Sequence, residues 1–368
     1  MRLAGVLGVL HLFADAATVT VVFRATDTDI APVAVLGWIV AYDLIAFGLQ
    51  PAFGWVQDRW GTPRTAMLAG LLLTIGGVAL LQGAAPPAVA VVVAAIGNAL
   101  FHLGAGARVL AQDLDRAAPV GVLVAPGALG LGVGLWFGQH PTAGPAWLVG
   151  LPVLAAAVVV ALSPSEGSVT RPVVLATARM APPVVVGTLF LLMTSIAIRS
   201  LVGMSAARGY PPSTWLVAGI PLAAFAGKLL GGLVADHSGW VRTTVVALVV
   251  SAPLLAFRYP HAVVLLAGLL VFQMTMPVTL VAIARLLPDR LATGFGLACL
   301  ALVLGSLPVT FGWGAELTAK PMLGLWVLLS ALAAWVGLTQ MGVPWRPNRV
   351  DGPVAPTSGR ELAEAADR

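Results

Sequence analysis

The sequence predicts an all-α membrane protein whose chain crosses a bilayer twelve times, in two halves of six helices each. Hydrophobic residues make up 59% of the 368 residues and charged residues only 10%, and the mean hydropathy is +0.96. Soluble globular domains carry about 25% charged residues, so this composition excludes them. A short motif that closes one apolar segment also returns once in the second half, as in transporters built from two repeats.

The predicted helices follow the spacing of the residues that interrupt the apolar sequence. A bilayer core about 30 Å thick needs about 20 apolar residues per helix, and proline, glycine or charged residues interrupt this chain at about that interval. The predicted segments are 3–23, 33–56, 65–83, 88–109, 119–139 and 146–163 in the first half, and 182–203, 213–234, 243–258, 261–284, 292–313 and 322–341 in the second. They divide the chain into an N-terminal bundle (1–163), a polar linker (164–181), a C-terminal bundle (182–341) and a tail (342–368) that is expected to be mostly disordered.

The first of these segments resembles a secretory signal peptide, because Arg2 precedes an apolar stretch. His11 and Asp15 interrupt that stretch, which continues to Phe23. We therefore expect an uncleaved first helix.

The basic residues indicate how the chain is oriented. The net charge is +5 and the pI about 10.1, but the basic residues are scattered in short loops and form no patch for nucleic acid. The loops on the side of the N-terminus hold most of the arginines, whereas the opposite loops hold only Arg24, Arg208, Arg258 and Lys320. The positive-inside rule then predicts that both termini are cytoplasmic.

Two loops share a pattern of glycine, aspartate and arginine. The stretch LQPAFGWVQDRWGTPR supplies Gly54, Asp58, Arg59, Gly61 and Arg64, and the stretch GGLVADHSGWVR supplies Gly232, Asp236, Gly239 and Arg242. In the first copy we expect Gly54 to let another helix approach closely, Asp58 to offer an anion to a neighbouring helix N-terminus, and Gly61 to permit a tight turn. An ordinary charged hairpin would explain one such loop, but the second copy at the corresponding place disfavours that reading.

Ionisable residues inside apolar segments are costly and therefore mark candidate transport sites. His11 and Asp15 lie four residues apart on one helix face, so they can hydrogen-bond and carry a proton, or act as a structural clamp. Asp43 has no basic partner on its own helix, so it has either a coupling or substrate role or an interhelical salt bridge. His102 is either a pathway residue or a hydrogen-bonded core histidine.

The second half contributes two intramembrane cations, Arg199 and Lys228. Either could neutralise a carboxylate of the first half or bind an anionic substrate. Lys228 lies one turn before the repeated motif and could instead extend toward the membrane interface, so Arg199 ranks above it. Gln273, with Met274 and Met276 nearby, could line a cavity or only pack between helices.

The first loop is similar to the loop signature of the major facilitator superfamily, and the resemblance covers almost the whole chain. It implies two pseudo-symmetric six-helix bundles, and loops that hold the halves together on the cytoplasmic side in the outward-open state. Four stretches resemble the fosmidomycin-resistance-like efflux branch of that superfamily: HLFADA in helix 1, LQPAFGWVQDR in helix 2, ALFHLGAGARVL in helix 4 and IRSLVG in helix 7.

The chain departs from that branch in helix 4. Leu103 and Gly104 stand where the branch has Pro and Glu, and Arg108 lies one position later, so drug specificity is not carried over. The run APGALGLGVG, from Ala125 to Gly134, loosely resembles the glycine-proline motif of the superfamily's antiporters, which favours export.

We predict a secondary active transporter of a bacterial-type cytoplasmic membrane that expels a small organic solute, a drug or a metabolite, in exchange for protons. Its expected partners are the solute, protons and the bilayer, without nucleic acid, and a monomer is the default. A proton-coupled uptake symporter is one alternative, and a non-transporting scaffold or sensor, disfavoured by the retained intramembrane charges, is another. The sequence contains no phosphate-binding loop, no paired metal motif and no nucleophile motif, so we expect no enzyme activity, no cofactor and no metal site.

Overall fold

A computed structural model describes residues 1–25, 32–83, 85–163, 180–211, 213–257, 259, 261–313 and 315–345. All regular secondary structure in these ranges is helical. The predicted linker and tail lie almost entirely outside the described residues.

The first half contains seven α-helices and two short irregular helices. These are α1 (Arg2–Ala25), α2 (Pro32–Asp43), the π-helix η1 (Leu44–Gly48), α3 (Gln50–Trp60), α4 (Pro63–Gln82), α5 (Pro87–Leu110), α6 (Ala118–Gln139), η2 (Pro141–Ala143) and α7 (Trp147–Leu162). The second half contains α8 (Pro182–Ser205), α9 (Thr214–Ser238), α10 (Trp240–Ala256), α11 (Ala262–Gln273), α12 (Met276–Leu286), α13 (Leu291–Thr310), η4 (Ala315–Thr318) and α14 (Lys320–Gln340).

The twelve predicted segments are all present. Within the described residues, 10 helical segments are long and apolar enough to cross a membrane, and Trp147–Leu162 and Trp240–Ala256 are shorter apolar helices. Two predicted helices are interrupted: segment 33–56 is α2, η1 and α3, and segment 261–284 is α11 and α12. The predicted fold class is confirmed, and the chain is a multi-pass membrane protein.

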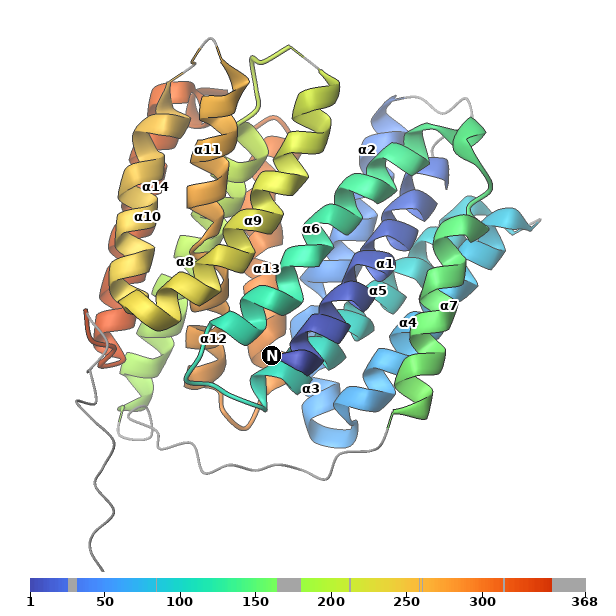
Figure 1. Cartoon of the computed structure of the whole chain (residues 1–368), viewed down its shortest axis with the longest axis horizontal. Coiled ribbons are helices and arrows are strands. Elements are labelled where there is room, and N and C mark those ends of the chain that lie inside the picture. Colours follow the sequence, from blue (N-terminus) through green and yellow to red (C-terminus); the bar gives the residue numbers. More distant parts are fainter. Residues whose placement is uncertain are drawn as a thin grey trace, which may run out of the picture.

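The helices form two bundles that meet through two pairs of helices. In Figure 1, α1–α7 form one bundle and α8–α14 the other. The bundles contact each other mainly where α6 packs on α9 and α3 packs on α13. The N-terminus lies at the same end as α3 and α12 (Figure 1), which is also where the two repeated motifs lie. We call this end the motif face.

Burial of the side chains fits a protein in lipid. Large apolar side chains such as Phe190 and Trp215 are 69% and 84% exposed, whereas small residues such as Ala14 and Ala94 are fully buried between helices. Small residues allow helix backbones to approach closely where no hydrophobic effect drives association. Polar chemistry is therefore concentrated in the few side chains that face the interior.

Candidate functional site

One cavity of about 360 Å³ lies between the two bundles, and every predicted pathway residue lines it. Those residues are His11, Asp15, Asp43, His102, Arg199, Lys228 and Gln273. They come from α1, α2, α5, α8, α9 and α11, so the fold brings together side chains that are far apart in the sequence. Their roles in transport stay predictions.

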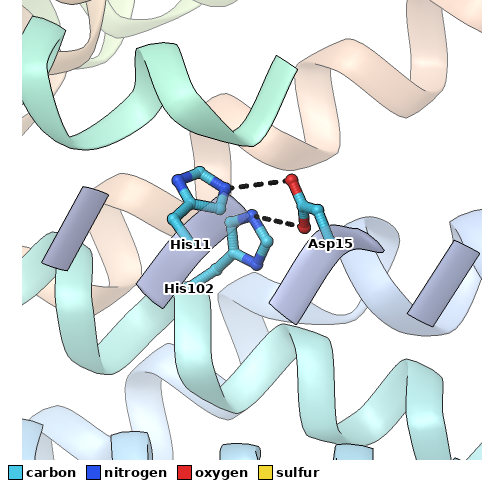
Figure 2. Close-up of side chains that lie close together, drawn as sticks. All are labelled: His11, Asp15 and His102. Atoms are coloured by element: carbon cyan, nitrogen blue, oxygen red, sulfur yellow. Dashed lines mark ion pairs between the residues drawn. The ribbon is translucent and has the colours of Figure 1, made fainter. Parts of the chain in front are cut away.

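His11, Asp15 and His102 form a compact buried cluster on the wall of the first half. His11 Nε2 lies 3.1 Å from Asp15 Oδ2, and His102 Nε2 lies 3.6 Å from Asp15 Oδ1. Figure 2 shows the two imidazole rings directed at the two oxygens of this single carboxylate. The predicted side-by-side contact of His11 and Asp15 on α1 is present, and His102 joins it from α5.

The backbone contacts of the two histidines restrict where protons can sit in this cluster. His11 Nδ1 lies 2.9 Å from the Leu123 carbonyl, and His102 Nδ1 lies 2.8 Å from the Asn98 carbonyl. A carbonyl oxygen only accepts, so both Nδ1 atoms carry hydrogen, and a neutral ring then presents a bare Nε2 to Asp15. Two lone pairs repel at 3.1 Å, so the contact of His11 with Asp15 requires a proton on one of them. The geometry of the contact therefore places a proton between His11 Nε2 and Asp15 Oδ2.

Two neighbours keep this cluster in place. Gly127 of α6 lies directly against it, and an added Cβ there would overlap His11 Nε2 and lie 2.8 Å from Asp15 Oδ2. Asn98, whose carbonyl accepts from His102, donates from Nδ2 to the Tyr42 hydroxyl at 2.6 Å. The glycine-rich run of α6 thus leaves space for the cluster, and Asn98 connects it to α2.

The same cluster has the donor types of a metal site. One ligand atom from each of His11, Asp15 and His102 can be chosen so that all three lie within 4.8 Å of one another. Each Nδ1–H is held by a carbonyl, which is how proteins orient the Nε2 of metal-binding histidines. The sequence prediction of no metal site rested on the lack of a local motif, and it stays a prediction.

Asp43 is the last residue of α2, directly before the π-helix η1, and it lines the cavity. π-helices are rare and occur often at functional sites, because the extra residue per turn changes where side chains point. The predicted alternative of an interhelical salt bridge is not formed: within the described residues, no Lys, Arg or His nitrogen lies within 4.0 Å of this carboxylate.

Arg199 and Lys228 line the opposite wall, on α8 and α9. Arg199 is 6% exposed and donates to the hydroxyls of Thr275 and Thr279, the latter at 3.1 Å. Lys228 lines the cavity, so its side chain does not take the predicted alternative position, extended toward the membrane interface. Neutralisation of these cations by the cavity carboxylates is also absent among the described ion pairs, since the partners of Asp15 are histidines.

The break between α11 and α12 supplies further lining residues. Gln273 and Met276 flank the break and face the cavity, as the sequence suggested, whereas Met274 is not among the lining residues. Sequence reasoning missed the apolar and thiol part of the wall, including Phe47, Phe295 and Cys299. In an apolar helix, the sequence alone does not distinguish an aromatic residue that lines a cavity from one that packs between helices.

The two loop motifs join the halves at the motif face. Asp58 Oδ1 accepts from the backbone N–H of Ala292 at 3.0 Å, and its Oδ2 accepts from the N–H and hydroxyl of Thr293 at 2.8 and 2.7 Å. These donors belong to the first turn of α13 in the other bundle. The expected contact of Asp58 with a helix N-terminus is therefore present.

Asp236 makes the reciprocal contact. Its two oxygens accept from the backbone N–H of Ala117 at 2.6 Å and of Ala118 at 2.9 Å, at the start of α6 in the first bundle. Arg116 Nε lies 3.5 Å from the same carboxylate. Each half thus caps a helix of the other half with an aspartate.

The glycines and arginines of the motifs differ in what they do. Gly54 lies against α13, where an added Cβ would come within 2.7 Å of the Ala292 backbone, so the expected close approach is present. Gly61 has φ −111°, which any residue can adopt, so a left-handed backbone conformation is not what makes glycine suitable for this turn. In the second copy Gly239 does have a positive φ of 98°.

The remaining motif residues lie around these contacts. Arg64 donates to the Ala161 carbonyl at 2.5 Å, and Gly232 lies against the Ala117 carbonyl. Arg59 and Arg242 are exposed at the motif face.

Comparison with known proteins gives a likeness in structure. No family profile and no curated protein sequence matches the chain. A crystal structure of a major facilitator superfamily transporter, FucP, in the outward conformation is similar with a TM-score of 0.69 and 13% identity, over 93% of this chain and 98% of that one. A variant of the E. coli fucose:proton symporter FucP gives a TM-score of 0.66 and 13% identity, over 92% and 98% of the two chains.

These structures do not distinguish the fosmidomycin-resistance-like branch from the rest of the superfamily, so the branch stays a prediction. The likeness, together with the two bundles and the two repeated motifs, shows that this chain has the fold of major facilitator superfamily transporters.

Proposed function

We propose that the protein is a secondary active transporter that moves a small organic solute across the cytoplasmic membrane, coupled to protons. The observation that carries the proposal is the buried His11–Asp15–His102 cluster on the wall of a cavity between two bundles, which we propose as the proton site. A cavity of about 360 Å³ is at the lower end of the range for small-molecule sites.

Proton coupling would work through the charge of the cluster. Moving a proton onto or off Asp15 and its histidines changes the net charge of a water-poor site, and a buried charge is costly unless it is paired. The protonated and deprotonated proteins therefore prefer different openings of the cavity. Transport follows if the solute binds one of these states better than the other.

The motif face would act as the cytoplasmic gate. Asp58 and Asp236 cap α13 and α6 only while the bundles are in contact at this end, so their hydrogen bonds stabilise the state that is closed there. Opening toward the cytoplasm breaks both caps. Both termini are then cytoplasmic, and one chain forms the whole pathway as a monomer.

For the direction of transport we propose efflux by drug or metabolite:proton antiport. Support comes from the short stretches that resemble the efflux branch and from the glycine-rich run of α6. Uptake by symport is the second candidate, because the same proton site serves either direction and one structural neighbour is described as a fucose:proton symporter.

The proposal can be tested in liposomes that contain the full-length protein and an internal pH dye. A gradient of each solute from a panel of organic acids, phosphonates and antimicrobials is imposed, and proton flux is recorded. We expect flux with one solute class in the wild type and none in Asp15→Asn, and a strong reduction in Asp43→Asn. The sign of the flux separates antiport from symport.

Asp289→Asn, the same change at an exposed carboxylate outside the cavity lining, is the matched control and should leave the flux unchanged. Solute flux that is unchanged in Asp15→Asn and is not accompanied by protons would refute the coupling. A protein that moves none of the solutes would leave the scaffold alternative.

A further inference from the structure

The charges that line the central cavity are separated between the two halves. Asp15 and Asp43 come from α1 and α2, whereas Arg199 and Lys228 come from α8 and α9. The cavity therefore has an acidic wall in the first half and a basic wall in the second.

Asp15 on the acidic wall has charged or chargeable partners within ion-pair distance, whereas the two cations of the basic wall form no contact ion pair. Asp15 is paired with two histidines of its own half. Within the ranges that the structure describes, no carboxylate oxygen lies within 4.0 Å of a nitrogen of Arg199 or Lys228. Arg199 is buried and Lys228 is half-buried. A charge that is shielded from water is unfavourable without a partner, so two such cations on one wall favour an anion in the cavity.

The guanidinium of Arg199 is held in place by neutral groups. Thr275 and Thr279 accept from its two terminal nitrogens, and Met276 Sδ lies 3.5 Å from Nη2. Hydroxyl and thioether groups orient the side chain without cancelling its charge. Arg199 Nε is buried and has no hydrogen-bond partner among the described residues, so the neutral groups around the guanidinium do not use all of its donors.

The break between α11 and α12 explains why these groups meet. Thr275 lies in the break and Thr279 one turn later, so both hydroxyls reach Arg199 on the neighbouring α8. An arginine held in this way has less side-chain freedom to lose when it binds a ligand.

We infer that the transported solute carries an oxyanion, a carboxylate or a phosphate-like group, and that Arg199 and Lys228 bind it. The inference rests on the proposed transport function and adds the substrate class. Guanidinium groups match the geometry of carboxylate and phosphate oxygens, and an ammonium adds a point charge. Phe47, Leu131 and Phe272 line the same cavity and provide an apolar surface for the rest of the solute.

Binding of matched probes tests this inference with the full-length protein in detergent. The probes are benzoate and phenylphosphonate, with neutral benzamide as the size-matched comparison, measured by calorimetry and by thermal unfolding. We expect the two anions to bind and to raise the unfolding temperature, and benzamide to do neither.

Variants of the basic wall then assign the site. Hydrogen bonds to charged groups contribute about 1.5–3 kcal/mol, so Arg199→Gln or Lys228→Gln should weaken anion binding about tenfold to a hundredfold. Arg208→Gln, which removes an exposed arginine outside the cavity lining, should leave the affinity unchanged. Asp43→Asn should strengthen anion binding, because it removes a negative charge from the opposite wall.

Arg199→Lys is a conservative variant that keeps the positive charge and removes only the planar guanidinium. The unfolding temperature of each variant without ligand shows whether the variant is folded. Equal binding of benzamide, no binding of either anion, or unchanged anion affinity in Arg199→Gln and Lys228→Gln would overturn the inference. The proposed function and the anion-binding inference can be refuted separately. Anion binding without proton-coupled flux refutes the coupling alone, and proton-coupled flux of neutral solutes refutes the anion site alone.

Discussion

Removing the Asp58 carboxylate should open the cavity toward the motif face, and the single cysteine of the chain can report it. Cys299 lines the cavity and is 5% exposed, so a thiol reagent reaches it only through an opening. In Asp58→Ala, the backbone N–H groups of Ala292 and Thr293 lose their acceptor across the two bundles.

The size of the effect follows from the contacts. Loss of a capping side chain costs about 0.5–2 kcal/mol, and loss of a negative charge at a helix N-terminus costs about 0.3–1 kcal/mol. Asp58 is only partly buried, so water weakens its contribution, and we expect a total of about 1–2 kcal/mol. That corresponds to a shift of about 5-fold to 30-fold toward the state that is open at the motif face.

The assay compares two thiol reagents in vesicles that expose either side of the membrane. A membrane-impermeant maleimide added from the motif face should label Cys299 about 5-fold to 30-fold faster in Asp58→Ala than in the wild type. A small permeant reagent controls for intrinsic reactivity, so the ratio of the two rates reports access. Asp58→Asn keeps one acceptor oxygen and should give a smaller effect.

Asp236→Ala provides the matched comparison on the other side of the interface. The two aspartates share no hydrogen-bond partner, so their free energies should add in the double variant. A labelling ratio unchanged from the wild type in folded Asp58→Ala protein would refute the reasoning, and so would a slower rate from the motif face.

Two further predictions concern the histidine cluster. Gly127→Ala should lower the unfolding temperature and abolish proton flux, because the added Cβ would overlap His11, at a cost of about 1–3 kcal/mol. Gly187→Ala, where the added Cβ meets nothing within 4 Å, is the control. Equal stability of the two variants would contradict the packing argument. Micromolar Zn²⁺ should inhibit proton-coupled flux in the wild type and much less in His102→Gln, and the inhibition should weaken as the pH falls, because protons compete for the imidazole nitrogens. Equal inhibition in both proteins would exclude the cluster as the zinc site.

The sequence predicted the helices because a bilayer imposes a simple rule on length and composition. It did not predict the π-helix after Asp43 or the break at Thr275. Both interruptions lie inside continuous apolar segments, and hydropathy does not report the pattern of backbone hydrogen bonds within such a segment. Both also place polar groups at the cavity, which is where local departures from regular helix are expected.

The candidate site was predictable to the extent that its contacts are local. His11 and Asp15 are four residues apart, so helix geometry alone places them together. The arrival of His102 depends on how α5 packs against α1, and single-sequence reasoning does not give that packing. Likewise a carboxylate in a loop predicted a helix cap, but not that Asp58 caps a helix of the opposite half.

The reciprocal caps also bear on how the chain is made. The first bundle enters the membrane before α9 has been synthesised, so the N–H groups of Ala117 and Ala118 must be hydrated until Asp236 arrives. In the same way α13 is synthesised long after α3, so Asp58 is already in the membrane protein when the N-terminus of α13 emerges. Each half therefore has one helix N-terminus that is capped only by an aspartate of the other half. Two separately expressed halves should associate through these caps.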